Sequence, residues 1–143
     1  MDHLAIMKKS WNLTDKILSG QKIIESRWYK NKYTPWDKIK IGEVIYFKNS
    51  GEPVTIRSSV KNILQFSDLN HNKVNEILKK YGKDDGIEKE NIKKFYDLFK
   101  DKKYCMLIFL KNPKKIKPFN INKKGFGTMS AWITVESINL IKV

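Results

Sequence analysis

Residues 20–27 read Gly-Gln-Lys-Ile-Ile-Glu-Ser-Arg, so three ionisable side chains follow a glycine of the kind that ends helices. The Ile-Ile pair before Glu25 and the Trp-Tyr pair after Arg27 favour a half-buried β-strand. Removing charged groups from water is unfavourable unless they pair with one another or contact a ligand. A polar cleft in which Lys22, Glu25 and Arg27 meet satisfies both conditions.

The alternation of side chains along a strand limits how these three groups can meet. Glu25 and Arg27 share one face, whereas Lys22 points the other way unless the strand begins with a bulge or twist. Lys22 can therefore join the other two only from the start of the strand. The simpler interpretation is an exposed strand with a cross-strand ion pair, which contributes less than ~1 kcal/mol.

The order of elements from Trp11 to Phe47 gives the motif its context: a predicted helix, a glycine, the charged strand and a second strand that enters through Ile41-Gly42-Glu43. The motif positions read GxKxxExR without departure. In these features the chain resembles the ASCH family, a part of the PUA-like superfamily of small β-barrels. The resemblance extends from about His3 to Leu110 and includes a later strand at Tyr104 to Phe109.

The resemblance implies a fold and leaves the activity open. Similar domains are described as RNA-binding modules, as amidohydrolases of acylated cytidine and as ribonucleases. The amidohydrolase branch uses the motif lysine, the residue three positions later and a carboxylate from a helical insertion. Here these correspond to Lys22, Glu25 and either Asp85 or Asp84 as candidate catalytic residues. The related enzymes have a threonine in place of Glu25, so their hydroxyl nucleophile is absent from this chain.

Composition indicates one globular domain over residues 1–143, since 143 residues with 41% hydrophobic content suit a single modest core, and the resemblance implies that this domain is ASCH/PUA-like. The single Cys105 permits no internal disulfide, and no apolar segment has the length of a signal peptide core or a membrane span. We therefore expect a cytoplasmic protein that does not contact membranes. Histidine spacing and glycine motifs predict no metal and no other cofactor.

The net charge of +14 is unevenly distributed along the chain. Residues 1–66 contain 12 basic and 6 acidic side chains, residues 67–101 contain 8 and 8, and residues 102–143 contain 9 and 1. The neutral middle segment carries two helical patterns, Val74/Ile77/Leu78/Tyr81 and Ile92/Phe95/Tyr96/Phe99. The positive excess therefore lies on the segments expected to form the sheet, which favours a polyanionic partner. Base composition or growth at high temperature is the alternative origin of so much lysine.

The densest basic segment, residues 111–124, contains six lysines and no acid, and it includes the candidate phosphate ligands Lys114, Lys115 and Lys117. Its two prolines predict a loop, because proline disrupts helices and central strands. The following Gly125-Phe126-Gly127 turn can present Phe126 to an unpaired base. The alternative is a solvated loop whose phenylalanine packs back onto the barrel.

Aromatic side chains interleaved with lysines follow the charged strand, and Trp28, Tyr29 and Trp36 are candidates to stack on a base above the charged cleft. Alternatively, these rings pack on the end of the barrel, and the sequence supports the two interpretations equally. Arg57, on a predicted strand from Val54 to Val60, is a weaker candidate to line the cleft.

The predicted fold class is α+β, a PUA-like mixed β-barrel with a short helix after the first strand and a helical insertion at about 67–102 before the closing strands. The predicted elements are a helix at Asn12 to Ser19 and strands at Leu4 to Met7, Lys22 to Tyr29, Val44 to Phe47, Val54 to Leu64, Tyr104 to Lys111 and Ala131 to Ile141. The insertion should pack beside the barrel and leave the charged cleft open.

These observations predict an RNA-binding domain that recognises single-stranded RNA or a particular nucleotide in the charged cleft. Arg27 would offer a bidentate fork, Glu25 would accept from an exocyclic amine, and Lys22 would contact a phosphate or carbonyl. The alternatives are an amidohydrolase of a modified nucleoside, a ribonuclease and a protein-interaction module. The sequence does not identify a protein partner.

Overall fold

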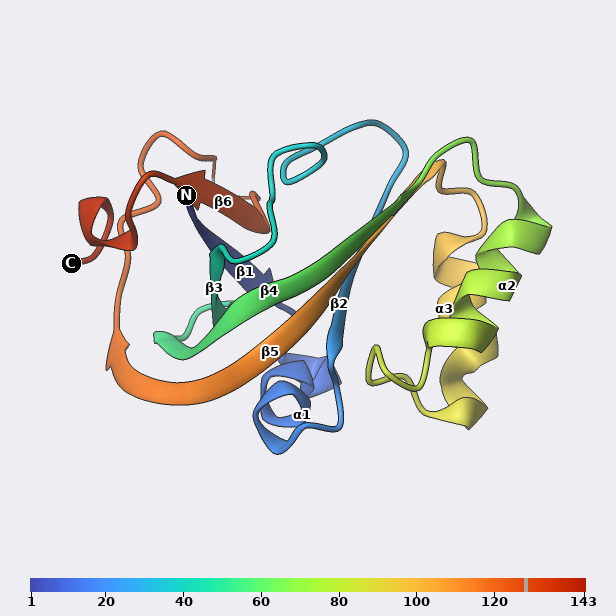
Figure 1. Cartoon of the computed structure of the whole chain (residues 1–143), viewed down its shortest axis with the longest axis horizontal. Coiled ribbons are helices and arrows are strands. Elements are labelled where there is room, and N and C mark those ends of the chain that lie inside the picture. Colours follow the sequence, from blue (N-terminus) through green and yellow to red (C-terminus); the bar gives the residue numbers. More distant parts are fainter. Residues whose placement is uncertain (128) are drawn as a thin grey trace.

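The computed structural model describes residues 1–127 and 129–143 and has one six-stranded mixed sheet in the order β2-β5-β4-β3-β1-β6 (Figure 1). The strands are β1 (Asp2–Met7), β2 (Ile24–Tyr29), β3 (Val44–Asn49), β4 (Val54–Phe66), β5 (Tyr104–Phe119) and β6 (Trp132–Val135). Only β1 and β3 pair in parallel, and the other neighbours are antiparallel. The long strands β4 and β5 curve strongly, so the sheet forms a half-barrel with β2 and β6 at its two edges.

The helices occupy the places that the sequence predicts. Helix α1 (Leu13–Ser19) follows the first strand and ends at Gly20, whose φ of 84° is unfavourable for residues with a side chain. Helices α2 (His71–Tyr81) and α3 (Ile92–Phe99) form the insertion and lie side by side at the far end of β4 and β5 in Figure 1. Short 3-10 turns at Lys9–Trp11, Lys89–Asn91 and Ile138–Leu140 complete the elements. The α+β fold with a helix after the first strand and a helical insertion before the closing strands is thus confirmed.

Side chains alternate between the two faces of β2 and β5, and each face contributes to a different hydrophobic cluster. One side of β5 contributes Met106, Ile108 and Leu110 to the cluster inside the half-barrel, while the other side contributes Cys105 and Leu107 to the cluster beneath the insertion. A third cluster lies where the C-terminal segment packs against β1 and β6. On β2, Glu25 and Arg27 pair with residues of the first cluster and so belong to the barrel side.

The predicted basic loop is wrong for residues 111–119, because β5 continues through both prolines to Phe119. Beyond Leu110, β5 pairs only with β4. Its other edge, which pairs with β2 earlier in the strand, is unpaired there, so a proline on that edge interrupts no pairing between strands. The register with β4 also shifts near both prolines, and Asn112 has a φ of 53°. Edge position and bulges are the contexts in which a strand accommodates proline.

The predicted closing strand is too long. Strand β6 ends at Val135, and the chain then forms a 3-10 turn at Ile138–Leu140, with Ile138 and Ile141 packed in the third cluster. The apolar spacing in this tail therefore reflects burial of a turn. No helix within residues 1–127 or 129–143 has the length and apolar character needed to cross a bilayer.

A buried histidine joins the first and last strands. The ring of His3 is fully buried, and its Nδ1 accepts from Trp132 Nε1 at 3.2 Å and lies 2.9 Å from Thr134 Oγ1. Since Nδ1 is an acceptor, Nε2 carries the proton and donates to Glu43 at 2.9 Å. Burial lowers the pKa of His3, although the Glu43 carboxylate opposes that shift.

This arrangement predicts a pH dependence of stability. Because the pKa of His3 is lower in the folded chain than in the unfolded chain, its stabilising contribution is present above the unfolded pKa of about 6.5 and is lost as the pH falls through the folded pKa. Urea unfolding of the native protein and of His3→Gln at pH 7.5 and pH 5.5 measures how much the free energy of unfolding of each changes between the two pH values. The native protein should lose more stability than the variant, by at most ~1.4 kcal/mol per pH unit for one proton. An equal loss in both would contradict this role of His3.

Candidate functional site

The motif side chains meet in one buried charged cluster, to which the insertion contributes a carboxylate. Lys22 Nζ donates to Asp85 Oδ1 at 2.5 Å and to the main-chain oxygens of Ile24 and Asp85 at 2.6 and 2.7 Å. It lies 3.2 Å from Glu25 Oε1, while Glu25 Oε2 accepts from Arg27 at 2.8 Å. The side chains of Lys22 and Glu25 are only 1% and 4% exposed. The structure thus brings Lys22, Glu25, Arg27 and Asp85 together.

Local geometry explains how Lys22 contacts both Glu25 on β2 and Asp85 in the insertion. Lys22 precedes the strand, and its own N–H donates to Lys16 in α1. The loop after α2 is fixed to this point because the N–H groups of residues 23 and 24 both donate to the carbonyl oxygen of Asp84. Gly86 follows with a φ of 82°, and a Cβ there would approach the Lys22 side chain to 3.2 Å. The insertion therefore covers the lysine, and the expectation of a charged cleft left open by the insertion is wrong at this end.

Burial opposes each charge in the cluster, and opposite charges outweigh it for two of the three buried groups. Burial alone would lower the pKa of Lys22, but the Asp85 and Glu25 carboxylates raise it, so the amine stays protonated. Lys22 and Arg27 similarly overcome burial and hold the pKa of Glu25 below its usual range. For Asp85, burial raises the pKa despite Lys22, and the charge of Glu25 adds to that shift. Burial thus favours the protonated form of Asp85, whereas the neighbouring cations favour the charged form of Glu25.

Arg27 connects edge strand β2 with the opposite end of the sheet. Its guanidinium donates to the carbonyl oxygen of Ala131 at 3.3 Å, contacts Met7 Sδ at 3.5 Å and lies 5.0 Å from the centre of the Trp132 ring. Its Nε is buried and makes no hydrogen bond among the described residues. We call this line of contact, where β2 faces β1 and the start of β6, the seam.

A pocket of about 340 Å³ opens on one side of Arg27, and we call it the motif pocket. Its polar lining includes Lys22, Glu25, Ser26, Arg27 and Asp85. Aromatic side chains also line it: Trp11 from the 3-10 turn after β1, Trp28 from β2 itself, and Phe95 and Phe99 from α3. Such a pocket, with few polar groups among apolar walls, is typical of small-molecule sites.

The candidate aromatic residues have different positions. Trp28 is 8% exposed and stacks on Phe99 of α3 at 4.8 Å, so it forms a wall of the motif pocket beneath the insertion and does not cover it from above. Tyr29 lines the same pocket, and its hydroxyl donates to Thr34. Burial raises the pKa of Tyr29 to about 12. Trp36 packs on Tyr104 and lines neither this pocket nor the second one described below, so its assignment to the cleft is wrong.

The remaining basic candidates lie elsewhere, on the exposed surface of β4 and β5. Lys114, Lys115 and Lys117 are exposed, and Arg57 is exposed directly opposite Lys114 in the ladder. Arg57 lines neither pocket, so the prediction that it lines the charged cleft is also wrong. Like charges opposite one another destabilise a sheet, and a bound anion relieves that repulsion. Lys115 pairs with Ile56 and so lies on the opposite face of the ladder from Lys114 and Arg57. We call these four exposed residues together the basic surface.

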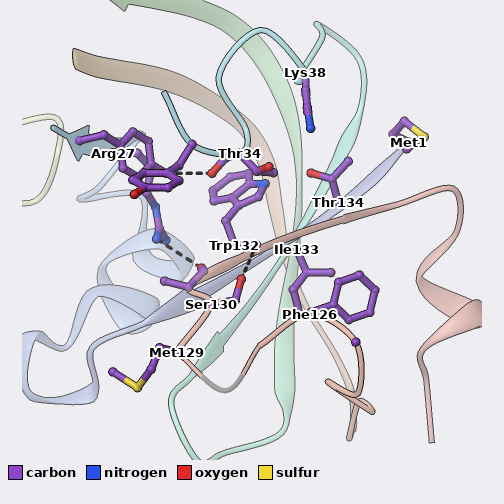
Figure 2. A pocket seen from close by; sticks show the side chains of 14 residues that line it. Met1, Arg27, Thr34, Lys38, Phe126, Met129, Ser130, Trp132, Ile133 and Thr134 are labelled. Carbon is purple, nitrogen blue, oxygen red and sulfur yellow. Dashed lines mark hydrogen bonds between the residues drawn. The ribbon is translucent and has the colours of Figure 1, made fainter. Parts of the chain in front are cut away.

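A second pocket of about 720 Å³ opens on the other side of Arg27, and we call it the seam pocket. Phe126, 37% exposed, lines it together with Tyr33, Lys38 and Trp132. Figure 2 shows Arg27 and Lys38 approaching the strand that carries Trp132 and Thr134 from different segments. Phe126 therefore lines the seam pocket and not the motif pocket.

Two contributors to the site were missed or misread from the sequence. Ser26 lies inside the motif, and its hydroxyl donates to Asp85 Oδ2 at 2.5 Å while it accepts from Trp28 Nε1 at 3.1 Å. Its place between Glu25 and Arg27 was the available signal. Trp132 was interpreted as core and is buried, yet its ring also contacts Arg27. This contact between positions far apart in the chain has no local sequence signal.

Comparison with solved structures identifies the fold. ASCH from Zymomonas mobilis aligns over 94% of this chain and 87% of its own with a TM-score of 0.67 and 16% identity. A mutant form of the same Zymomonas protein aligns over 97% and 91% with a TM-score of 0.70 and 16% identity. The chain has the ASCH fold. No protein-family model and no curated protein matches the sequence.

Two further structures share this fold more distantly. The hypothetical protein PH0355 aligns over 81% of this chain and all of its own, with a TM-score of 0.52 and 22% identity. The N-terminal domain of Staphylothermus marinus McrB aligns over 82% and 75%, with a TM-score of 0.51 and 16% identity. The ASCH fold predicted from the GxKxxExR residues is therefore confirmed, and the similarity extends beyond Leu110, where the resemblance in sequence ended.

Proposed function

We propose that this ASCH-fold protein binds single-stranded RNA and holds one nucleotide in the motif pocket. The observation that supports this most strongly is the joint lining of that pocket by paired charges and aromatic rings. Proteins recognise unpaired bases by stacking them on aromatic side chains and by hydrogen bonding to their edges. A volume of about 340 Å³ lies at the lower end of the ~300–1,000 Å³ range of ligand pockets, which suits a nucleotide-sized ligand.

Each charged side chain has a distinct role in this proposal. Glu25 is already bonded to Lys22 and Arg27, and its carboxylate retains acceptor capacity for the exocyclic amine of a base. Arg27 offers its remaining N–H groups to a phosphate or a base edge. Lys22 is surrounded by oxygens from Ile24, Glu25 and Asp85, so it positions the carboxylates and does not contact RNA directly.

The basic surface supplies the second part of the proposed interaction. Its lysines and arginine lie on neighbouring strands without side-chain burial, where phosphates can reach them. Contacts of this kind add affinity without reading sequence.

The two parts predict different effects in RNA binding. Replacing Lys114, Lys115 and Lys117 with glutamine should weaken binding to all oligonucleotides and reduce the slope of log affinity against log salt by ~2, at ~0.7 per phosphate contact. Glu25→Gln should change which base is preferred and leave the salt slope unchanged. Fluorescence anisotropy with labelled eight-nucleotide RNAs at several salt concentrations measures both effects.

A matched control removes the same charge from exposed lysines of the insertion, with Lys79, Lys80 and Lys93 replaced by glutamine. This variant should bind RNA nearly as the native protein does. If the two triple variants weaken binding equally, net charge explains the interaction and the basic surface has no special role. If Glu25→Gln, shown by circular dichroism to be folded, keeps the native base preference, the motif pocket does not read the base.

One observation favours hydrolysis of an acylated nucleoside as a second candidate. Asp85 contacts Lys22 directly, so the insertion supplies a carboxylate at the position that the amidohydrolase resemblance implies. Glu25 can serve as a general base for water, and Asp85, whose pKa is raised, can donate a proton to the leaving amine. No hydroxyl nucleophile is needed when water attacks the acyl carbon directly.

This alternative predicts release of cytidine from N4-acetylcytidine, measured by chromatography. Asp85→Asn retains the shape of the side chain and removes its ability to exchange a proton, so it should reduce turnover ~100-fold or more if Asp85 is a general acid. Equal turnover by native protein and folded Asp85→Asn would contradict that role. Absence of turnover in the native protein would rule out this substrate.

A further inference from the structure

The two pockets adjoin along the seam. Arg27, Tyr29 and Ala131 line both the motif pocket and the seam pocket. Glu25 lies on one side of Arg27 along β2 and Tyr29 on the other, a distance of four strand residues or ~13 Å at ~3.3 Å per residue. A ligand that fills both pockets must therefore be extended and must cross Arg27.

The chemistry of the seam pocket differs from that of the motif pocket. Its described lining includes two cations, Arg27 and Lys38, and no carboxylate. Rings of Tyr29, Tyr33, Phe126 and Trp132 line it together with the hydroxyls of Thr34, Ser130 and Thr134. A positive site with aromatic rings and hydroxyl groups suits an anion that carries a flat ring, as a nucleotide does.

The position of Arg27 between the pockets suits a phosphodiester. One of its terminal nitrogens bonds Glu25, and the other bonds the Ala131 carbonyl oxygen at 3.3 Å, a long contact that a phosphate oxygen can replace. The guanidinium is held between Glu25 and the Trp132 ring, so it is oriented before any ligand arrives. Its side chain remains 13% exposed, which gives a ligand access to one edge.

We propose that the seam binds two successive nucleotides of a single RNA strand, one in each pocket, with the phosphate that joins them at Arg27. This inference rests on the proposed function, because it assumes that the motif pocket holds a nucleotide. It adds that the recognition unit is a dinucleotide step and that Tyr33 and Lys38 bind the second nucleotide. The basic surface then contacts RNA beyond this step.

The test compares ligands of increasing size on the full chain. Isothermal titration with nucleoside 5′-monophosphates and with dinucleoside monophosphates, which contain one phosphate each, measures the gain from the second nucleotide. The best dinucleotide should bind about tenfold or more tightly than the best mononucleotide, since stacking a second base adds affinity of that order. The ³¹P resonance of the joining phosphate should shift on binding.

Two exposed residues of the seam pocket provide the variants. Tyr33→Ala and Lys38→Gln should each remove most of the dinucleotide gain, measured as the ratio of dinucleotide to mononucleotide affinity, because both residues line the seam pocket and not the motif pocket. Leu98→Ala, an exposed apolar residue on α3, is the control and should retain the full gain. Circular dichroism confirms that each variant is folded.

The outcomes separate this inference from the function on which it rests. If eight-nucleotide RNA and mononucleotides bind but the dinucleotide gives no gain, the seam proposal is overturned and the proposed function stands. The same holds if the seam variants weaken mononucleotide and dinucleotide binding equally. If neither nucleotides nor RNA bind, both fail.

Discussion

Lys22 holds together three parts of the chain. Its main-chain N–H donates a hydrogen bond to α1, and its ammonium group donates to the carbonyl oxygen of Ile24 at the start of β2 and to the carboxylate of Asp85 in the loop after α2. A buried ammonium is tolerated only when oxygens surround it, so each of these segments must stay in place for the charge to remain compensated. The shape of the motif pocket, the position of Glu25 and the docking of the insertion all follow from that requirement.

Arg27 connects the two edges of the half-barrel at its open side. A half-barrel has two edges, and here a single guanidinium reaches from β2 to Met7, Ala131 and Trp132 at the other end. It therefore divides the seam into two pockets of different chemistry, one with paired charges and one with a positive excess. The motif thus supplies a central cation and an arginine that separates two binding spaces, while the exposed lysines of β5 lie on another surface.

The sequence was most informative where one strong local constraint acted alone. Gly20 ended the helix as predicted, and Lys22 approached from the start of the strand, because a charged amine next to Glu25 had no other route. The two amphipathic helices were likewise evident from their spacing. Asp85 was already a candidate, but its direct bond to Lys22 depends on the loop geometry around Gly86, which sequence patterns do not determine.

Predictions failed where tertiary context changed the meaning of a residue. Proline usually interrupts strands, yet β5 continues through Pro113 and Pro118 because only one of its sides is paired there. Trp36 and Arg57 were assigned to the cleft from proximity in sequence and from charge, and neither side chain lines it. The seam itself arises from contacts between residues 27 and 131, which no local pattern could have indicated.

The central claim is that the buried Lys22 charge organises this structure, and urea unfolding of Lys22→Met tests it most directly. Methionine fills a similar volume but leaves Glu25 and Asp85 buried without their cation, so the free energy of unfolding should fall by ~3–5 kcal/mol. Lys93→Met, at an exposed position on α3, is the matched control and should leave the unfolding midpoint unchanged. A Lys22→Met protein as stable as the native chain would contradict the claim.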